Sequence, residues 1–473
     1  MLKKIDPGFH PQDVRHFLEN YTAACPEDVV RIGAPVSDDQ DATALIWALA
    51  GQGRQPMLRL DNVTGLNAPV VCNVFGSRRR IAHLFDTDES GLHEAYQTRS
   101  RAATTPKEVA FGPVLEEVVT GVDIDLETLP MLKHFETDRQ KYITSGIIIG
   151  EHPETGVGNL SYHRAMIHTP NQLATSLHSR GHLWRLLNLS KELGRPMPVA
   201  MVIGGHPLFM LAASARVAFE EDERDIAGGL MGAPLEVVRT PAYGIRVPAQ
   251  AEIVLEGVIE HDAFVEEGPF GEFTGYSSDR STNNLFTVET ILRRSQPILV
   301  SVAGGNSAEH LNLGRIPREA EMVEKLKARF PSVTAVHYPS SGTHFHAYVA
   351  MNQSREGEAR QVMLGLMGWD QYLKNVIVVD ADVDITRDEE VLWAVSAHFQ
   401  PHRDVVIVEG LPGNALDPSA SGIGTTSRMG LDATRGPDFH GTRALISEAA
   451  QARAAALLQG LRQGKSTPTG AGL

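Results

Sequence analysis

The sequence predicts a multidomain protein of mixed α/β and α+β architecture, and three observations support this prediction. The chain has 473 residues, well beyond the roughly 100 to 200 of a typical single domain. Helical and strand patterns alternate in its first and last thirds, whereas short apolar strands dominate the middle third. Apolar residues make up 42% of the chain and charged residues 21%, which is typical of a globular protein with a buried core. This composition excludes a disordered chain, a coiled coil and a collagen.

Residues 1–105 are predicted to form a small N-terminal α/β portion. The predicted elements are helices at 11–19 and 42–49 and strands at 57–60 and 69–75. The stretch 106–130 is acidic and interrupted by Gly and Pro, so we expect a domain boundary near residue 105.

Residues 106–305 are predicted to form a barrel-like α+β domain. Short apolar runs ended by Gly, and runs that alternate apolar with polar residues, indicate strands joined by hairpins. One helix, stopped by Gly194, lies among them. The predicted elements are strands at 145–150, 199–204, 253–259 and 286–292 and a helix at 179–193.

Residues 306–462 return to the α/β alternation. The first predicted helix ends before Pro331, because proline cannot continue a helix. The predicted elements are helices at 318–330, 356–366, 388–399 and 442–461 and strands at 333–338, 376–380 and 404–409. The Gly, Ser, Thr and Pro residues of 463–473 predict a disordered tail.

Charge and cysteine content narrow the classes of partner and compartment. Lys and Arg total 43 against 58 Asp and Glu, a net charge of -15, so the surface should repel nucleic acid. Cys25 and Cys72 are too few for a disulfide framework or a cysteine-rich zinc site. The start of the chain lacks a signal-like apolar stretch, and no run of about 18 apolar residues predicts a transmembrane helix. We therefore expect a cytoplasmic protein.

The segment from Glu266 to Tyr276 is the most unusual local pattern. Three glycines and a proline predict an irregular backbone that holds two acids, Glu267 and Glu272, five residues apart. A loop can direct both carboxylates into one pocket, whereas a strand would point them to opposite faces. The alternative interpretation is a solvated acidic turn. Elsewhere, His178 and His182 stand four apart, a spacing that is compatible with metal binding or with a structural role.

At these positions the sequence resembles the UbiD family of reversible decarboxylases, which use prenylated flavin mononucleotide (prenylated FMN). The family's Glu-Gly-Pro-x-Gly-(Glu/Asp) element is matched from Glu267 to Glu272, and its Asn-x-x-x-x-Arg element from Asn159 to Arg164. Further matches at 69–76, 247–257 and 429–434 extend the resemblance over nearly the whole chain.

The resemblance implies that Arg164, Glu267 and Glu272 form the catalytic set. Glu272 would protonate the substrate carbon after carbon dioxide leaves, Glu267 would pair with Arg164, and Arg164 would face the substrate carboxylate and the flavin. The grouping is chemically sensible, because a guanidinium between two carboxylates orients one of them and leaves the other free to carry a proton.

The resemblance also implies a metal-bound cofactor. The family holds the phosphate of prenylated FMN through Mn²⁺ (or Mg²⁺), and the matching ligands are Asn159, His182 and Glu223. A slip of the alignment would exchange Glu223 with an adjacent acid, Glu220, Glu221 or Asp222. A K⁺ ion held by backbone carbonyls is also implied. Arg428 stands where the family often carries a lysine near the phosphate, although a surface cation is also compatible with the sequence.

The substrate class follows from the same resemblance. Family substrates are unsaturated acids, and the prenylated flavin serves as the electron sink. His310 and Arg318 match the furan-dicarboxylate branch, where they would bind a second carboxylate, so furan-2,5-dicarboxylate, giving 2-furoate, is the first substrate expected. Purely structural roles for His310 and Arg318 are equally compatible with the sequence. So are two different functions: a hydroxybenzoate or polyprenyl-hydroxybenzoate decarboxylase, and a non-catalytic flavin-binding subunit of a carboxylase complex.

The family's architecture predicts the fold and role of the middle and C-terminal parts of the chain. A flavin-reductase-like split β-barrel at 106–305 would bind the cofactor, and a C-terminal α/β domain at 306–462 would form the dimer. We expect a homodimer or a homohexamer, and a prenyl-flavin synthase as the supplier of the cofactor.

Overall fold

The computed structural model describes residues 8–177, 181–420 and 424–462. They fall into two compact units, one ending at Thr434 and one beginning at Arg435. The second unit contains helix α11 (Glu448–Arg462), so the predicted alanine-rich helix begins later than residue 442. The tail predicted at 463–473 lies outside the described residues.

A four-stranded sheet forms the N-terminal part, in the order β1-β2-β3-β17. Its strands are β1 (Val29–Ile32), β2 (Met57–Leu60), β3 (Val70–Cys72) and β17 (Leu299–Val300). Because β17 follows the central part of the chain, this sheet joins segments that are far apart in the sequence. Its helices are α1 (Val14–Ala24), α2 (Asp41–Ala50), α3 (Arg78–Leu84) and α4 (Leu92–Arg101). Helix α1 starts later than predicted because Asp13 caps it, accepting a hydrogen bond from the N–H of Arg15.

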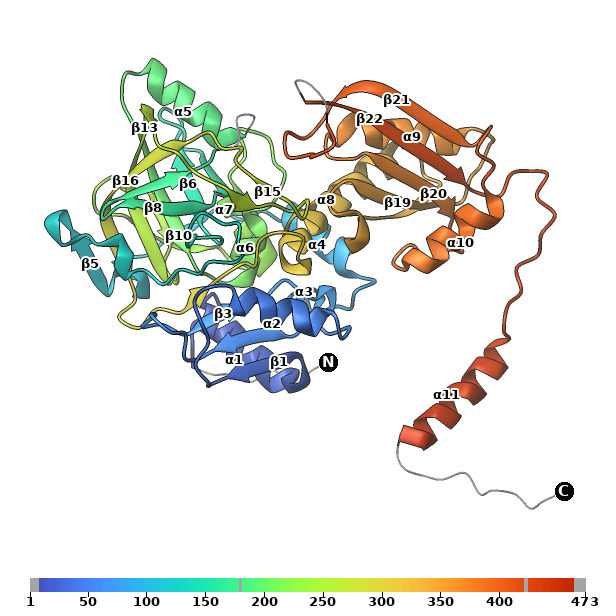
Figure 1. The fold of residues 1–473 in the computed structure, drawn as a ribbon, viewed down its shortest axis with the longest axis horizontal. Helices are drawn as coiled ribbons and strands as arrows, with labels where there is room; N and C mark the ends of the chain where they lie inside the picture. The colour runs from blue at the N-terminus through green and yellow to red at the C-terminus, as the bar shows by residue number, and fades with distance from the viewer. Residues whose placement is uncertain (1–7, 178–180, 421–423, 463–473) are drawn as a thin grey trace. The chain divides into compact units, whose positions relative to one another are not determined.

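The central part is built on an eight-stranded sheet with the order β7-β6-β10-β13-β16-β9-β8, and β5 also pairs with β16 (Figure 1). Its strands are β5 (Glu117–Thr120), β6 (Ile147–Glu151), β7 (Gly158–Tyr162), β8 (Ala165–Thr169), β9 (Gln172–Thr175), β10 (Met197–Ile203), β13 (Ile253–Phe264) and β16 (Asn284–Arg293). Neighbouring strands in this sheet run antiparallel. Among the described residues no pairing of β7 with β8 closes the sheet, so the split barrel stays a prediction.

Smaller elements complete the central part. A three-stranded sheet joins β12 (Arg246–Pro248), β11 (Glu236–Arg239) and β4 (Lys107–Glu108), and a short hairpin joins β14 (Phe270–Gly271) to β15 (Ser277–Ser278). The helices are α5 (His182–Glu192), α6 (Pro207–Ala212) and α7 (Glu223–Met231). Sequence periodicity misses α6 and α7, because α6 is buried all round and α7 contains two glycines.

A five-stranded sheet with the order β18-β19-β20-β22-β21 forms the C-terminal part. Its strands are β18 (Val333–His337), β19 (His346–Met351), β20 (Asn375–Asp380), β21 (Val405–Pro412) and β22 (Thr425–Ala433). One face packs against α8 (Ala308–Arg329) and α9 (Glu358–Trp369), and the other packs against α10 (Asp388–His398).

Helix α8 corrects one prediction, because it begins at Ala308 and not at residue 318. Ser307 caps it by accepting the N–H of His310, and the helix then continues through Pro317. Proline inside a helix is costly, but Pro317 and its neighbours Ile316 and Arg318 are buried, so tertiary packing outweighs the local preference. Helix α8 also contacts α4, β18 and α9, and it thereby links the parts of the unit.

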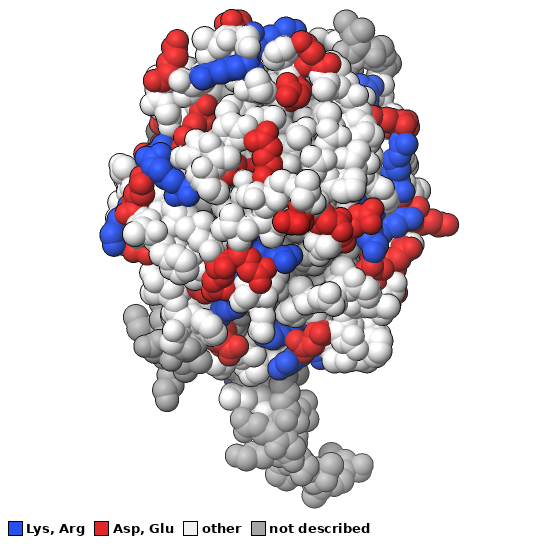
Figure 2. Space-filling view, turned by 90° about the vertical axis from the view of Figure 1, so that its left-hand side faces the viewer, with Lys and Arg blue, Asp and Glu red and all other residues white. Residues whose placement is uncertain are grey.

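Basic and acidic side chains are interspersed over the face shown in Figure 2. Within the described residues, none of the helices has the length and apolar character needed to span a membrane.

Candidate active site

Arg164 joins the two acids that the sequence singled out. It lies in the connection between β7 and β8, and Glu267 and Glu272 lie on the loop around the β14–β15 hairpin. Its Nε donates to Glu267 Oε1 at 2.9 Å and its Nη2 donates to Glu267 Oε2 at 3.0 Å, a bidentate pair. Its Nη1 donates to Glu272 Oε1. The predicted catalytic set is therefore assembled around one guanidinium.

The two acids differ in how they contact Arg164. Both are buried, and Glu267 uses both oxygens on Arg164. Burial raises the pKa of Glu272, and although Arg164 opposes this shift, the repulsion from Glu267 adds to it. For Arg164, burial disfavours the charged form, but the two carboxylates outweigh it and raise its pKa. Arg164 therefore stays charged, and the pKa of Glu272 lies above its usual value.

The loop's glycines and aromatic residue shape this arrangement. Gly268 and Gly275 have φ angles of 103° and 83°, which side chains disfavour. The ring of Phe270 lies 4.7 Å from the Arg164 guanidinium carbon, an additional favourable contact for the cation. The segment is a structured loop with inward-pointing acids, and the interpretation of a solvated turn is wrong for Glu267 and Glu272.

The three predicted metal ligands also meet. Asn159 lies on β7, His182 is the first residue of α5, and Glu223 is the first residue of α7. Asn159 Nδ2 donates to Glu223 Oε1 at 2.8 Å and lies 3.3 Å from His182 Nδ1. Glu223 Oε2 accepts the N–H of Leu160 at 2.9 Å. His178 lies outside the described residues.

Two of the three neighbouring acids are engaged elsewhere, whereas the third, Glu220, interacts electrostatically with His182. Asp222 caps α7 and pairs with Arg224, and Glu221 accepts the N–H of Ala218. Glu223 is thus the acid of this run that contacts Asn159.

The chemistry of this set fits a hard divalent cation. Burial raises the pKa of Glu223 to about 8 and lowers the pKa of His182, so that the cation-free site favours neutral groups. A half-turn of the Asn159 amide would present its oxygen in place of its nitrogen. Carboxylate and amide oxygens with one imidazole suit Mn²⁺ or Mg²⁺. The described residues contain no cluster of three His, Cys, Asp or Glu side chains placed to bind a metal, so the set depends on the amide of Asn159.

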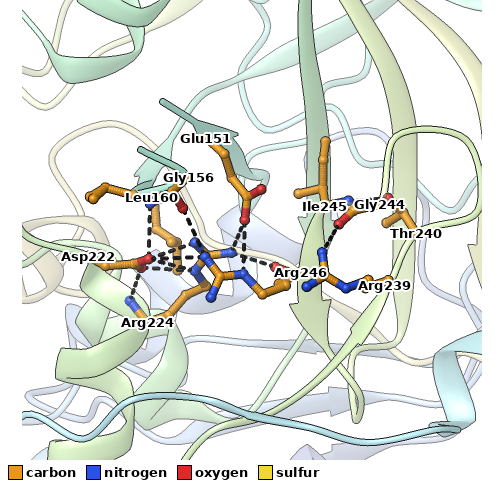
Figure 3. Close-up of polar contacts among 12 residues, drawn as sticks. Glu151, Gly156, Leu160, Asp222, Arg224, Arg239, Thr240, Gly244, Ile245 and Arg246 are labelled. Carbon is orange, nitrogen blue, oxygen red and sulfur yellow. Dashed lines mark hydrogen bonds and ion pairs between the residues drawn. The ribbon is translucent and has the colours of Figure 1, made fainter. Parts of the chain in front are cut away.

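The buried Arg224 is the centre of an ion-pair network with the half-buried Glu151 and Asp222, which Arg246 joins (Figure 3). Arg224 donates to Glu151 Oε1 and to Asp222 Oδ2, both at 2.6 Å, and Arg246 Nε donates to the same Glu151 oxygen at 3.2 Å. Asp222 Oδ2 also accepts the N–H of Gly158 at 3.0 Å. Since Asp222 and Gly158 directly precede the two predicted ligands on α7 and β7, the network fixes the backbone from which both ligands extend.

Arg428 lies inside the C-terminal part and not on the surface. It is buried on β22, where it donates to the main-chain oxygens of Asp370 at 3.0 Å and Pro412 at 2.8 Å. The interpretation as a surface cation is therefore wrong, and its role near the cofactor phosphate stays a prediction.

His310 and Arg318 both lie on α8, where Arg318 is buried and His310 is half-buried. His310 Nδ1 donates to the oxygen of Gly305 at 3.1 Å, and burial lowers the pKa of its ring. The Arg318 guanidinium lies 4.4 Å from the ring of Tyr372, with its Nε 3.4 Å from Asp370 Oδ2. Arg318 Nη1 has no hydrogen-bond partner among the described residues.

Two further basic side chains, which no sequence pattern singled out, adjoin this pair. Arg315 is buried, and its Nε and Nη2 have no hydrogen-bond partner in the described part of the chain. The ring of His344 lies 6.5 Å from that of His310 and 4.9 Å from that of Phe273, the residue after Glu272. Burial lowers the pKa of His310 and, further, that of His344, so both imidazoles favour the neutral form. The cationic cluster, which is Arg315 and Arg318 with the imidazoles of His310 and His344 beside them, therefore lies beside the loop of the catalytic acids. Arg315 could have been found from its spacing of three residues before Arg318 on a helix, whereas His344 carries no local signal.

Comparison with known proteins identifies the family. Models of the N-terminal, Rift-related and C-terminal domains of 3-octaprenyl-4-hydroxybenzoate carboxy-lyase match residues 26–99, 107–307 and 311–433. The chain belongs to the UbiD family. It is 33% identical over 403 residues to the anhydromevalonate phosphate decarboxylase of Aeropyrum pernix, covering 85% of this chain and 89% of that protein.

Solved structures of UbiD-class enzymes share the fold. HmfF from Pelotomaculum thermopropionicum, solved in complex with FMN, superposes with a TM-score of 0.88 at 32% identity, covering 94% of this chain and 99% of that one. An evolved dimeric form of HmfF was solved with prenylated FMN. The vanillic acid decarboxylase of Sedimentibacter hydroxybenzoicus gives a TM-score of 0.81 at 27% identity, covering 98% and 100%. The predicted UbiD family, mixed α/β multidomain fold and decarboxylase class are confirmed.

Proposed function

We propose that this decarboxylase uses prenylated FMN to remove carbon dioxide, reversibly and without oxidation, from an aromatic or heteroaromatic acid that carries a second anionic group. Furan-2,5-dicarboxylate, giving 2-furoate, is the first substrate to try. The observation that supports this most strongly is the buried Glu267–Arg164–Glu272 set. A degenerate, non-catalytic subunit would have no physical need for all three side chains.

Each member of the set has a distinct task in the proposed reaction. Glu267 holds Arg164 through two parallel hydrogen bonds, so that the guanidinium has a fixed direction towards the carboxylate that leaves. The bound cofactor supplies the electron sink. Glu272 gives its proton to the substrate carbon as carbon dioxide departs, and its raised pKa suits this role.

Asn159, His182 and Glu223 would hold the Mn²⁺ (or Mg²⁺) ion that binds the cofactor phosphate. Support comes from their convergence and from the oxygen and imidazole chemistry of the set. A nearby K⁺ ion and a contribution from Arg428 belong to the same proposal.

The cationic cluster supports a substrate with a second negative charge. Arg315 and Arg318 bear buried N–H groups that lack hydrogen-bond partners in the described structure, and such donors favour an anionic ligand. A carboxylate would satisfy them, and so would a phosphate, as in the substrate named for the Aeropyrum pernix relative. A phosphorylated unsaturated acid is therefore a second candidate, and it should be assayed beside furan-2,5-dicarboxylate.

The decisive experiment uses protein produced together with a prenyl-flavin synthase and supplied with Mn²⁺. We expect flavin-like absorbance and carbon dioxide release from at least one diacid or phosphorylated acid. Glu272→Gln should abolish turnover while the cofactor stays bound, and Glu266→Gln, an exposed acid on the same loop, serves as its matched control. Full activity of Glu272→Gln would refute the proton donor. Flavin absorbance without turnover of any acid would favour the non-catalytic subunit.

Arg318→Ala separates the substrate classes. Removing this cation should reduce diacid turnover by at least about tenfold more than monoacid turnover, because only the diacid loses a charge-assisted contact. Equal effects on both would favour a hydroxybenzoate or polyprenyl-hydroxybenzoate decarboxylase.

The oligomeric state needs a separate measurement. Light scattering on the same preparation tests the proposed homodimer or homohexamer.

A further inference from the structure

Residues 134–142, which precede β6, hold the loop that carries the catalytic acids. The N–H of Arg139 donates to the oxygen of Pro269 at 3.0 Å, and its Nη1 donates to the oxygen of Gly268 at 3.3 Å. The hydroxyl of Tyr142 donates to the oxygen of Pro269 at 3.4 Å. These contacts attach the first half of the acid loop to a segment more than a hundred residues earlier in the chain.

Asp138 makes the contact nearest to Glu272. Its Oδ1 accepts the N–H of Gly271, the residue directly before Glu272, at 2.9 Å. Its Oδ2 accepts the N–H groups of Phe135 at 3.0 Å and His134 at 3.3 Å. The side chain is 3% exposed, and burial raises its pKa, but the three N–H donors counteract that shift. They match an ionised carboxylate, which accepts hydrogen bonds on both oxygens.

Residues 134–142 lie close to the backbone of the acid loop because Phe135 packs on a glycine, Gly271. A Cβ atom on Gly271 would lie 2.3 Å from Cδ2 of Phe135, so this ring packs directly on the glycine. The peptide N–H of Gly271 is therefore held by Asp138 on one side while Phe135 covers its Cα. The position of Glu272 depends on both contacts.

We infer that Asp138 is a positioning residue for the proton donor: it fixes the backbone before Glu272 and places a second negative charge beside it. This inference rests on the proposed role of Glu272 as the acid.

Burial and three charged side chains determine the pKa of Glu272. Burial raises its pKa, Arg164 lowers it, and the negative charges of Glu267 and Asp138 raise it again. Glu267 is committed to Arg164 through two hydrogen bonds, whereas Asp138 contacts only backbone donors. Asp138 therefore favours the protonated form of Glu272 without competing for the guanidinium. Several charged and titratable groups face Glu272 and Asp138 from the packed elements. They are Arg164, Glu267, Asp138, Lys133, Arg139 paired with Glu266, Tyr142 and, beyond Phe273, His344.

Asp138→Asn tests the inference, since the amide oxygen can still accept the N–H of Gly271 while the charge is lost. A protonated Glu272 is needed for turnover, so activity should fall as pH rises through its pKa. This fall is the alkaline limb of the pH–activity profile. Without the negative charge of Asp138, the limb should move to lower pH by about one unit, with a several-fold loss of kcat. Thr137→Val is the matched control, because it removes a neutral contact of the same segment to Ser277 and should leave the limb in place.

A second measurement does not depend on turnover. In the cofactor-free protein, infrared titration of the carboxylic band that disappears in Glu272→Gln should show a lower pKa in Asp138→Asn, while Asp138→Glu, which keeps the charge, should stay near the wild type. Should Asp138→Asn fail to fold, Asp138→Ser removes the same charge. An unmoved titration in a folded neutral variant would overturn the inference, even if kcat fell. If the titration moves but no acid is turned over, the proposed function fails and the positioning role stands.

Discussion

Glu319 provides a quantitative test of how the C-terminal part is held. It lies on α8 and is 0% exposed. Its Oε2 accepts Arg78 Nη2 at 2.8 Å and contacts His93, both from the N-terminal part, and its Oε1 accepts His337 Nδ1 at 3.1 Å and the N–H of Tyr338 at 2.8 Å. One carboxylate therefore joins α3, α4, α8 and β18.

Glu319→Gln should destabilise the unit measurably. Removing one partner of a buried ion pair costs about 3–5 kcal/mol, because Arg78 is left uncompensated. An unfolding entropy of about 2.1 cal/mol/K per residue, applied to the unit that ends at Thr434, gives about 0.9 kcal/mol/K. The expected fall in Tm is thus about 3–6 °C.

The matched control is Glu324→Gln on the same helix. Glu324 also reaches α4, where it accepts a hydrogen bond from Gln97 at 2.9 Å and pairs with Arg101, but it is 49% exposed. Exposed pairs contribute about 0–1 kcal/mol, so its Tm should fall by no more than about 1 °C. Differential scanning calorimetry of both variants measures the difference. Equal shifts would refute the reasoning that burial of Glu319 makes its ion pairs strong.

The difference in Tm between the wild type and Glu319→Gln should depend on pH in a definite direction. Burial opposes the charge of Glu319, but Arg78 and His93 outweigh it and hold its pKa well below the usual range. A lowered folded-state pKa contributes stability that is fully present above the unfolded value of about 4.3 and is lost as pH falls through the folded value. The gap in Tm between wild type and Glu319→Gln should persist from pH 8 to pH 6 and narrow below about pH 4.

Three further predictions address the metal site and the sheet. Arg224→Met should lower Tm by about 1–3 °C, because the half-buried Glu151 and Asp222 lose their hydrogen bonds from a buried guanidinium. Arg239→Met, whose side chain is 54% exposed, should lower Tm by less than about 1 °C, and calorimetry measures the difference. Asn159→Ala should weaken Mn²⁺ binding to the cofactor-free protein by at least about tenfold in electron paramagnetic resonance titrations, and unchanged binding would contradict the site. Gly257→Ala would place a Cβ 2.0 Å from the oxygen of Thr287 and should cost about 1–3 kcal/mol in denaturant unfolding.

The sequence is most informative where a local rule decides the structure. Periodicity alone predicts the strand at 57–60 and the helix near 42–49, and they match β2 and α2 within a residue or two. The prediction for helix α8 starts ten residues too late, because the rule that proline ends a helix gives no weight to the packing that buries Pro317. Strand β22 is missed, since its exposed and buried residues alternate through Thr, Ser and Arg and carry little apolar signal.

The same distinction applies to the candidate site. Motifs predict Glu267, Glu272 and Arg164, because each motif holds its residue at a fixed place on a short segment. No motif predicts Asp138, since nothing within residues 134–142 indicates that Gly271 will pack there. Contacts between segments far apart in the chain follow from the tertiary fold, and a single sequence does not show them.

Aromatic side chains connect the catalytic set to the cationic cluster, and this connection bears on the substrate proposed above. Phe273 follows Glu272 directly, and its ring lies 4.9 Å from His344 and 5.8 Å from Tyr372, the residue over which Arg318 lies. Phe273 therefore joins the acid loop to the side chains that surround Arg318. A substrate whose second anion engages Arg318 would draw these elements together and fix Glu272 against its reacting carbon. An acid without that anion would lack this source of positioning energy, so discrimination should appear in kcat as well as in KM.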